Sequence, residues 1–442
     1  MKVKITTRNI LSWIKTVFIN VVAICFIIIF FEAYLAYDEF DREFGIGRVT
    51  DTYEKGSRTH INTNEKYPVD LYPNATFVFE ELKKEGKRGI KRFSPGALVV
   101  NDMPGIDFEG ETVFPFAGVS NIGTVYCKES GFWVVYDSDE HGFRNKKGTW
   151  KDAKKVSPDV VLLGDSFTQG ACIEESDTFS SAIRRTGRSV INTGVGGTGP
   201  IIQYGIFKEY IAPVKPKKVL WMFFAEDIRD AVTEVKNPLL SNYLSDAGFK
   251  QDLMNKQDLI DKSLSFFYEV GYPKMLYDLR NKRQDRKYIV TAKIVERSFF
   301  NGSKSFFQVK KLIRSLHEDV DPTEGNEEHK LDLFQTVLSK MNEEIKGWGG
   351  ELVFAYIPTW VQYGGTKDSY GISVTDNYLL KKDIINIVEE HGVKSIDLDS
   401  EFIRKNDAPH TMYNDNKYGH FHPTAYREIG EYLAERFEKL TR

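Results

Sequence analysis

From residue 159 onward, short apolar runs alternate with stretches that fit amphipathic helices, and this alternation constrains the fold more than any other feature. A run such as DVVLLG at 159–164 is typical of a strand that is buried on both faces of a parallel sheet. Strand and helix in alternation predict an α/β domain with a parallel sheet. The expected strands are 159–164, 190–192, 219–224, 352–357 and 395–398, and the expected helices are 178–186, 201–212, 330–347, 377–390 and 423–439.

The N-terminus has the pattern of a membrane anchor. Residues 16–31 carry no charge, and with their apolar flanks they approach the ~20 residues that a membrane-spanning helix needs. Basic residues precede this run and acidic residues follow it, so the positive-inside rule places the N-terminus in the cytoplasm. We therefore expect residues 1–37 to be a cytoplasmic tail and a single transmembrane helix in the cell inner membrane, with the rest outside the cytoplasm. A cleaved signal peptide is the alternative, although no A-x-A site follows.

Two further regions flank or interrupt the α/β pattern. Residues 38–150 begin with a polar, turn-rich stretch and continue with short apolar runs such as TFVF, GALVV, ETVFPF and GFWVVY, which predict a stalk and a small β-rich lobe. Residues 235–329 are charged and helical in pattern. We interpret them as a helical insert in the α/β domain of residues 151–442, acting either as one wall of a substrate cleft or as a solubilising insertion.

Charge and cysteine content limit the functional classes. The 60 Lys and Arg against 63 Asp and Glu give a net charge of −3, which argues against a general nucleic-acid binder. Three cysteines are too few for a disulfide framework. Cys25 lies in the apolar N-terminal run, which leaves Cys127 and Cys172 as the two that could pair.

A serine follows the first predicted strand in the sequence Gly164-Asp165-Ser166-Phe167-Thr168-Gln169-Gly170. A Ser on a sharp strand-to-helix turn exposes its hydroxyl at the carboxyl end of the sheet, where open α/β sheets bind ligands. The following helix directs its N–H groups and positive end to the same place, which favours a developing oxyanion. Alone, a Gly-Asp-Ser tripeptide also fits an ordinary turn in which Asp or Ser caps a helix.

Two later segments strengthen the catalytic interpretation. The first is Asn192-Thr193-Gly194-Val195-Gly196-Gly197, and the second is Tyr418-Gly419-His420-Phe421-His422-Pro423. Together with VVLLGDSFTQG, they resemble the motif blocks of the SGNH (GDSL-type) hydrolase superfamily. The resemblance is strongest to its membrane-anchored bacterial members and to the related polysaccharide O-acetyltransferase domains. It implies a three-layer, flavodoxin-like parallel sheet and no metal or organic cofactor.

The resemblance also implies roles for individual residues. Ser166 takes the position of the nucleophile, Gly197 offers a backbone N–H to the oxyanion, and His420 takes the position of the general base. His422 is an alternative base, and His420 with His422 has the spacing of half a metal site, although no Cys, Asp or Glu cluster accompanies it in sequence.

Two positions depart from the family pattern. Glu226 stands where relatives have an Asn whose side chain donates to the oxyanion, and a charged carboxylate cannot donate. No acid lies two or three residues before His420, where relatives have the Asp that orients the base. Asp415, five residues before His420, could orient the ring only if its loop folds back.

We therefore keep hypotheses from two classes. The first is a membrane-anchored serine esterase or deacetylase that removes acyl groups, chiefly acetyl, from a cell-envelope glycan through an acyl-enzyme. A polysaccharide O-acetyltransferase shares this chemistry but needs a partner membrane protein that supplies the acyl group. The second class is a catalytically weak glycan-binding or assembly protein. The aromatic residues that could stack on sugar rings are Trp133, Tyr136, Trp221, Trp360 and Tyr363.

Overall fold

A computed structural model describes residues 84, 89–127, 129, 133–153, 155–268, 327–363, 380–414 and 419–441. The chain divides into two units, and all of these residues belong to the unit formed by Gly56–Pro273 and Pro322–Arg442. The predicted anchor at residues 1–37 lies outside the described residues. Within the described ranges, no helix combines the length and the apolar character needed to span a bilayer.

Five strands form a parallel sheet in the order β10-β9-β8-β6-β7. This order places the second strand beside the first and the third to fifth on its other side, as in flavodoxin-like folds, so the α/β parallel-sheet part of the predicted fold class is confirmed. The strands match the predicted runs within a residue at each end: β6 (Val160–Gly164), β7 (Val190–Asn192), β8 (Lys218–Phe224), β9 (Glu351–Ile357) and β10 (Lys394–Asp397).

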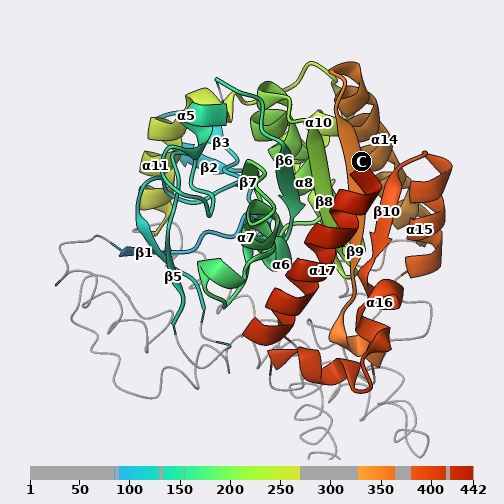
Figure 1. Ribbon diagram of the computed structural model, residues 1–442. Helices are drawn as coiled ribbons and strands as arrows, with labels where there is room; N and C mark the ends of the chain where they lie inside the picture. Colours follow the sequence, from blue (N-terminus) through green and yellow to red (C-terminus); the bar gives the residue numbers. More distant parts are fainter. Residues whose placement is uncertain are drawn as a thin grey trace, which may run out of the picture. The chain divides into compact units, whose positions relative to one another are not determined.

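Helices cover both faces of this sheet, because alternate side chains of each buried strand point to opposite sides. On one face, Leu220 and Met222 of β8 join a core with α7 (Phe179–Arg184) and α17 (Pro423–Thr441), which lie side by side in Figure 1. On the other face, Trp221 of β8 stacks on Phe334 of α14 (Glu327–Gly347) at 5.4 Å between ring centroids. The helices α8 (Pro200–Ile206), α9 (Asp227–Glu234) and α15 (Lys381–Glu390) pack with α14.

Shorter helical segments complete this part of the chain. A π-helical turn at Phe207–Ile211 continues α8 directly. Other short α-helices are α5 (Thr149–Ala153), α6 (Ser166–Gln169) and α16 (Leu398–Glu401). The 3₁₀ turns are Glu175–Asp177, Ala212–Val214, Leu253–Asn255, Trp360–Tyr363, Ile403–Lys405 and Pro409–Met412.

The lobe before the α/β domain contains short strands. One sheet has the order β1-β4-β5, from Gly89–Lys91, Gly123–Val125 and Val135–Asp137, and β2 (Ile106–Phe108) pairs with β3 (Glu111–Val113) in a hairpin. The strand predicted at GALVV is wrong, because Gly96–Val100 forms the helix α4. Pro95 before it presets a helical φ, and five residues are too few for alternation to decide between strand and helix.

The described part of the insert is helical and packs against the lobe. It contains α10 (Pro238–Ser245) and α11 (Gln257–Phe266), and residues 269–326 lie outside the described residues. Asp261 of α11 accepts hydrogen bonds from the N–H of Ser120 at 2.9 Å and from its hydroxyl at 2.6 Å. The insert and the lobe are thus joined through α11.

Candidate active site

The turn between β6 and α6 presents Ser166. Asp165 caps α6, since its Oδ1 accepts the N–H of Phe167 at 2.9 Å. Gly164 ends the strand, and a Cβ there would collide with Thr168 Oγ1 and the carbonyl oxygen of Met222. Only glycine therefore allows this close turn, and Ser166 begins the helix at the carboxyl end of β6.

His420 lies against Ser166, as predicted. Its Nε2 is 2.7 Å from Ser166 Oγ, which is hydrogen-bond distance for proton transfer. The preceding segment is held in place because the N–H of Asn414 donates to the carbonyl oxygen of His420 at 2.9 Å. His422 has a different role, since its Nδ1 accepts the N–H of Ala425 at 3.1 Å in the first turn of α17. The geometry therefore places His420, not His422, at the serine.

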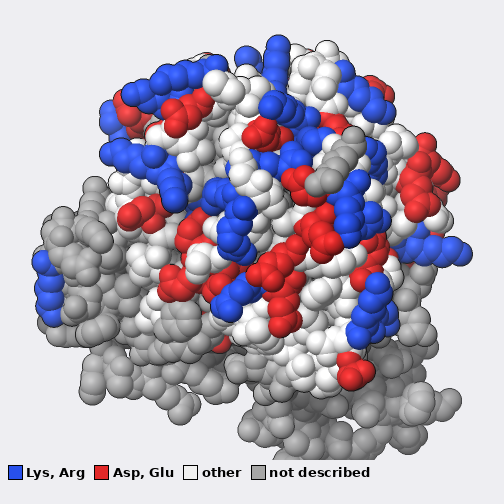
Figure 2. Space-filling view, viewed as in Figure 1, with Lys and Arg blue, Asp and Glu red and all other residues white. Residues whose placement is uncertain are grey.

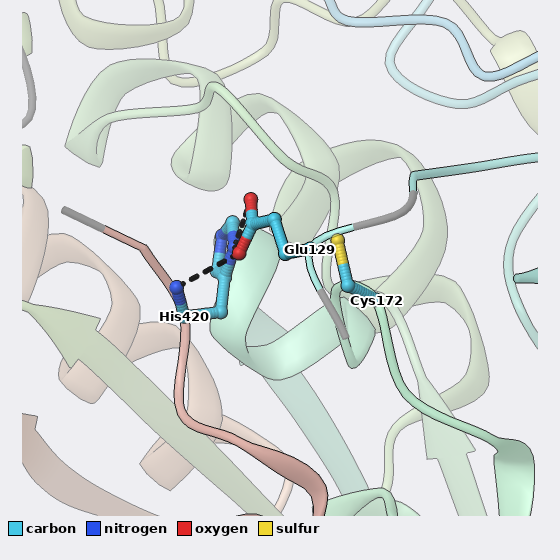
Figure 3. A group of neighbouring side chains, drawn as sticks. All are labelled: Glu129, Cys172 and His420. Carbon is cyan, nitrogen blue, oxygen red and sulfur yellow. Dashed lines mark hydrogen bonds and ion pairs between the residues drawn. The ribbon is translucent and has the colours of Figure 1, made fainter. Parts of the chain in front are cut away.

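The acid that orients His420 is Glu129, which the sequence analysis did not find. His420 Nδ1 lies 3.0 Å and 2.9 Å from the two carboxylate oxygens of Glu129, and the His420 backbone N–H donates to Oε2 at 3.1 Å (Figure 3). Glu129 comes from the loop that joins β4 to β5 in the lobe. Asp415, the predicted candidate, lies outside the described residues. No local spacing could indicate Glu129, because 291 positions separate it from His420.

The opposite charges of Glu129 and protonated His420 shift the pKa values of both groups. Burial works against the carboxylate, but the charge of His420 and its hydrogen bonds prevail and lower the pKa of Glu129 to about 2. Burial also works against the imidazolium, but the Glu129 charge and hydrogen bond prevail and raise the pKa of His420 above 6.5. Glu129 therefore stabilises the protonated form of the His420 ring.

Asp165 offers the Ser166 hydroxyl a second partner. Its Oδ2 lies 3.1 Å from Ser166 Oγ, and burial raises the pKa of Asp165 to about 6 despite the opposing charge of His420. A hydroxyl has one proton, so Ser166 can donate to His420 or to Asp165 but not to both. The shorter distance, 2.7 Å, is the one to His420.

The lobe also holds the loop with Gly196 and Gly197. The Gly196 carbonyl oxygen accepts from Arg92 Nη1 at 2.9 Å and from Ser94 Oγ at 3.0 Å. The Gly197 carbonyl oxygen accepts the N–H of Gly96 at 3.1 Å. Gly197 has a φ of +74° and lines the same cavity as Ser166. The sequence analysis placed Gly197 at the site but missed that the lobe fixes its orientation.

Glu226 lines the cavity, but its carboxylate is engaged elsewhere. It is 2% exposed, its Oε1 accepts the hydroxyl of Thr359 at 2.6 Å, and its Oε2 lies 3.7 Å from Arg229 Nη2. A buried carboxylate with a cationic neighbour is an acceptor. Glu226 therefore offers this cavity wall an acceptor and not a donor.

A cavity of about 220 Å³ opens beside Ser166 and His420. Its apolar lining comes from Phe167, Phe224, Trp360 and Val361, and its acidic lining from Asp165, Glu226, Asp227 and Asp230. Among the aromatic residues predicted to stack on sugars, Trp360 lines this cavity, whereas Tyr136 and Trp221 are buried in the core at 8% and 0% exposure. The cavity has no lining residue from the described part of the insert.

Cys172 also lies beside the Glu129–His420 pair. One ligand-type atom of each of Glu129, Cys172 and His420 lies within 4.8 Å of the other two, as three metal ligands would (Figure 3). However, Cys172 is bonded to Cys127 with an S–S distance of 2.05 Å, which confirms that these two cysteines pair. A disulfide sulfur is not the thiolate that binds metals, so this group lacks one of its three ligands.

No family model and no curated protein match the chain. Solved structures that resemble it do so at low overall similarity, and three of them serve as examples. A protein assigned to the G-D-S-L lipolytic family from Desulfitobacterium hafniense has 12% identity, covering 62% of this chain and 97% of its own, with a TM-score of 0.32. A lipase/acylhydrolase from Enterococcus faecalis has 12% identity, 64% and 95% coverage and a TM-score of 0.33. A protein assigned as an acylhydrolase from Bacteroides fragilis has 13% identity, covering 67% of this chain and 96% of its own, with a TM-score of 0.34.

In this fold, the turn with Ser166, the loop with Gly197 and the segment with His420 before the last helix meet at one cavity, so the three sequence segments that carry the resemblance lie together.

Proposed function

We propose that the protein is a serine ester hydrolase that works through an acyl-enzyme on Ser166. The observation that carries this proposal is the 2.7 Å distance from Ser166 Oγ to His420 Nε2, with Glu129 on the other ring nitrogen. Neutral His420 takes the hydroxyl proton as Ser166 Oγ attacks the ester carbonyl. The tetrahedral intermediate then collapses, and the leaving alcohol takes the proton from His420. Water, deprotonated by the same ring, cleaves the acyl-serine.

The proposed oxyanion hole uses backbone donors. Gly197 lines the cavity, and among the described residues its N–H has no hydrogen-bond acceptor, so it is available to a developing oxyanion. The N–H of Ser166 is the second donor in this proposal. Glu226 supplies none, which lowers the expected rate relative to a site with a donor there, by roughly 10²–10³ per lost donor.

We further propose that the substrate is an acyl ester, chiefly an acetyl ester, of a neutral cell-envelope glycan. The cavity combines the ring of Trp360, which can stack on a sugar, with the carboxylate of Asp230, which can accept hydrogen bonds from hydroxyls. The same carboxylate repels an anionic sugar. The Cys127–Cys172 disulfide supports a location outside the cytoplasm, in keeping with the predicted inner-membrane anchor.

A second candidate is a catalytically weak SGNH-like protein that binds glycan, and the acceptor at Glu226 is the observation that favours it. An O-acetyltransferase would use the same acyl-enzyme, with a sugar hydroxyl in place of water and a partner membrane protein as acyl source. Nucleic acid is not expected as a partner. On the face shown in Figure 2, basic and acidic side chains are interspersed, and the whole chain has a net charge of −3.

The test uses the full-length protein in a mild detergent, with p-nitrophenyl acetate turnover and covalent labelling by a serine-reactive fluorophosphonate. Ser166→Ala and His420→Ala should lose both signals, whereas the exposed controls Ser176→Ala and His410→Gln should keep them. Turnover and labelling in wild type no greater than in Ser166→Ala would contradict the hydrolase and favour the glycan-binding candidate. Acetyl transfer to an added oligosaccharide that exceeds hydrolysis would favour the transferase.

A further inference from the structure

The disulfide lies where the triad acid meets the nucleophile turn. Cys127 is two residues before Glu129, and Cys172 is six residues after Ser166. In Figure 3 the Cys172 side chain lies next to Glu129 and His420. The bond therefore connects the lobe segment that carries the acid to the α/β segment that carries the serine.

The Cys172 end of this link is rigidly held. Cys172 is fully buried, and the buried Arg144 side chain holds the chain on both sides of it. Arg144 Nη1 donates to the carbonyl oxygen of Gly170 at 2.5 Å, and Nη2 donates to that of Ile173 at 2.9 Å. A cysteine between two such contacts is a fixed point to which a loop can be attached.

The Cys127 end controls the reach of Glu129. Cys127 lies at the base of the β4–β5 loop, where its carbonyl oxygen accepts the N–H of Val134 at 2.9 Å. Two residues of extended chain span at most about 7 Å, so Glu129 stays near the disulfide whatever conformation the loop adopts. Glu129 itself is 35% exposed, and it is held to His420 by hydrogen bonds and an ion pair, with which water can compete.

We propose that the Cys127–Cys172 disulfide is a positioning element of the active site that holds Glu129 against His420, so that full hydrolytic activity requires the oxidised bond. This proposal rests on the proposed ester hydrolysis only for its effect on rate. Reduction by a dithiol or a phosphine adds two electrons and two protons, gives two thiols and oxidises the reductant. It frees the loop with Glu129 while Ser166 and His420 stay on the α/β domain.

The first test is independent of any substrate. In the full-length protein labelled at histidine, NMR measures the pKa of His420, which is assigned with His420→Gln. We expect Cys127→Ser/Cys172→Ser to lower this pKa toward the value in Glu129→Gln, because the ring loses its carboxylate. A pKa equal to that of wild type would overturn the proposal, whether or not the protein hydrolyses esters.

The second test is kinetic. We expect the double serine variant to lose at least about tenfold in kcat with KM little changed, and less than the roughly 10⁴-fold that loss of a triad acid costs. In the Glu129→Gln background, removing the disulfide should cause no further loss, because the residue it positions is already absent. An equal additional loss in that background would assign the disulfide a general structural role and overturn the proposal. Wild type without esterase activity would contradict the proposed function alone.

A folding control keeps both tests interpretable. If the double variant does not fold, the folded wild type is reduced in place with a phosphine and followed by histidine NMR and circular dichroism. We expect the fold to persist while the His420 pKa falls, and reoxidation should restore it. Unfolding on reduction as well would show that the bond holds the fold rather than Glu129, which would also overturn the proposal.

Discussion

The carboxylate of Glu129 lies 2.9 Å from Nδ1 of His420, although the two residues come from opposite ends of the described chain. Glu129 belongs to the lobe and His420 to the last loop of the α/β domain. The lobe also fixes the carbonyl oxygens of Gly196 and Gly197. The lobe is therefore part of the candidate active site, because it contributes the carboxylate beside His420 and orients the loop with Gly197.

Replacing Glu129 with Gln should lower kcat by roughly 10² to 10⁴, with little change in KM. The amide keeps the shape of the side chain but removes the charge that stabilises imidazolium and the preference for the Nδ1–H tautomer. Steady-state ester hydrolysis checks this. The matched control is Glu174→Gln, an exposed carboxylate that should leave kcat unchanged. Equal rates for Glu129→Gln and wild type would show that His420 works without this acid.

The pH dependence should report the same pair. The acid limb of kcat/KM follows the fraction of neutral His420 in the free enzyme. Since the Glu129 charge raises the pKa of His420, activity should rise with pH through a midpoint above 6.5, and Glu129→Gln should move this midpoint to lower pH. The raised pKa of His420 also affects folding stability. The ion pair with Glu129 stabilises the folded state fully below pH 6.5, and this contribution is lost as the pH rises through the pKa of His420 in the folded state.

Titration of Asp165 must be distinguished from titration of His420 in the pH profile of kcat/KM. The pKa of Asp165 is raised to about 6, and its carboxylate also contacts Ser166. Asp165→Asn keeps a residue that can cap α6 but removes this titration. Because the Asp165 charge also raises the pKa of His420, but less than Glu129 does, a limb that persists in Asp165→Asn and shifts further in Glu129→Gln is assigned to His420. The reverse pattern would assign it to Asp165 and contradict the prediction.

Much of the α/β domain could be predicted from sequence because its signals are local. Buried parallel strands read as continuous apolar runs, so the run at 190–192 coincides with β7 (Val190–Asn192). In the lobe the elements are three to five residues long, and tertiary contacts decide their form. Gly96–Val100, predicted as a strand, is helical and approaches Gly197 so closely that a Cβ at Gly96 would collide with its carbonyl oxygen.

The candidate site likewise contains residues that local sequence signals indicate and residues that only the folded chain brings together. Ser166, Gly197 and His420 lie in short motifs whose spacing is visible in the sequence. Glu129 has no motif, because only the folded lobe brings it to His420. The Thr359 partner of Glu226 was equally inaccessible, because 133 positions separate the two residues, whereas Arg229 lies only three positions away in α9.

Glu226 should stabilise the fold as the partner of a buried cation. Glu226→Gln keeps an acceptor for the Thr359 hydroxyl but leaves the Arg229 charge, 1% exposed, without this carboxylate. Breaking a buried pair by removing one partner costs about 3–5 kcal/mol, which urea unfolding would detect. The exposed control Glu343→Gln should change the free energy of unfolding by less than about 0.5 kcal/mol. Glu226→Gln/Arg229→Met should recover most of the loss, and an unaffected single variant would show that the pair does not contribute.

Gly197→Ala should reduce kcat more than it reduces stability. The φ of +74° is strained for alanine, by about 1–2 kcal/mol, and its Cβ would collide with Ser94 Oγ, so the loop must shift and move the Gly197 N–H away from the oxyanion. We expect a fall in kcat of up to roughly 10²–10³, the value of one oxyanion donor. Gly187→Ala is the matched control, since Gly187 has a φ of +88° with no atom within 4 Å of an added Cβ. Gly187→Ala should lower the free energy of unfolding through backbone strain while leaving kcat unchanged. If Gly197→Ala keeps kcat as well, the N–H of Gly197 does not stabilise the oxyanion and another donor must do so.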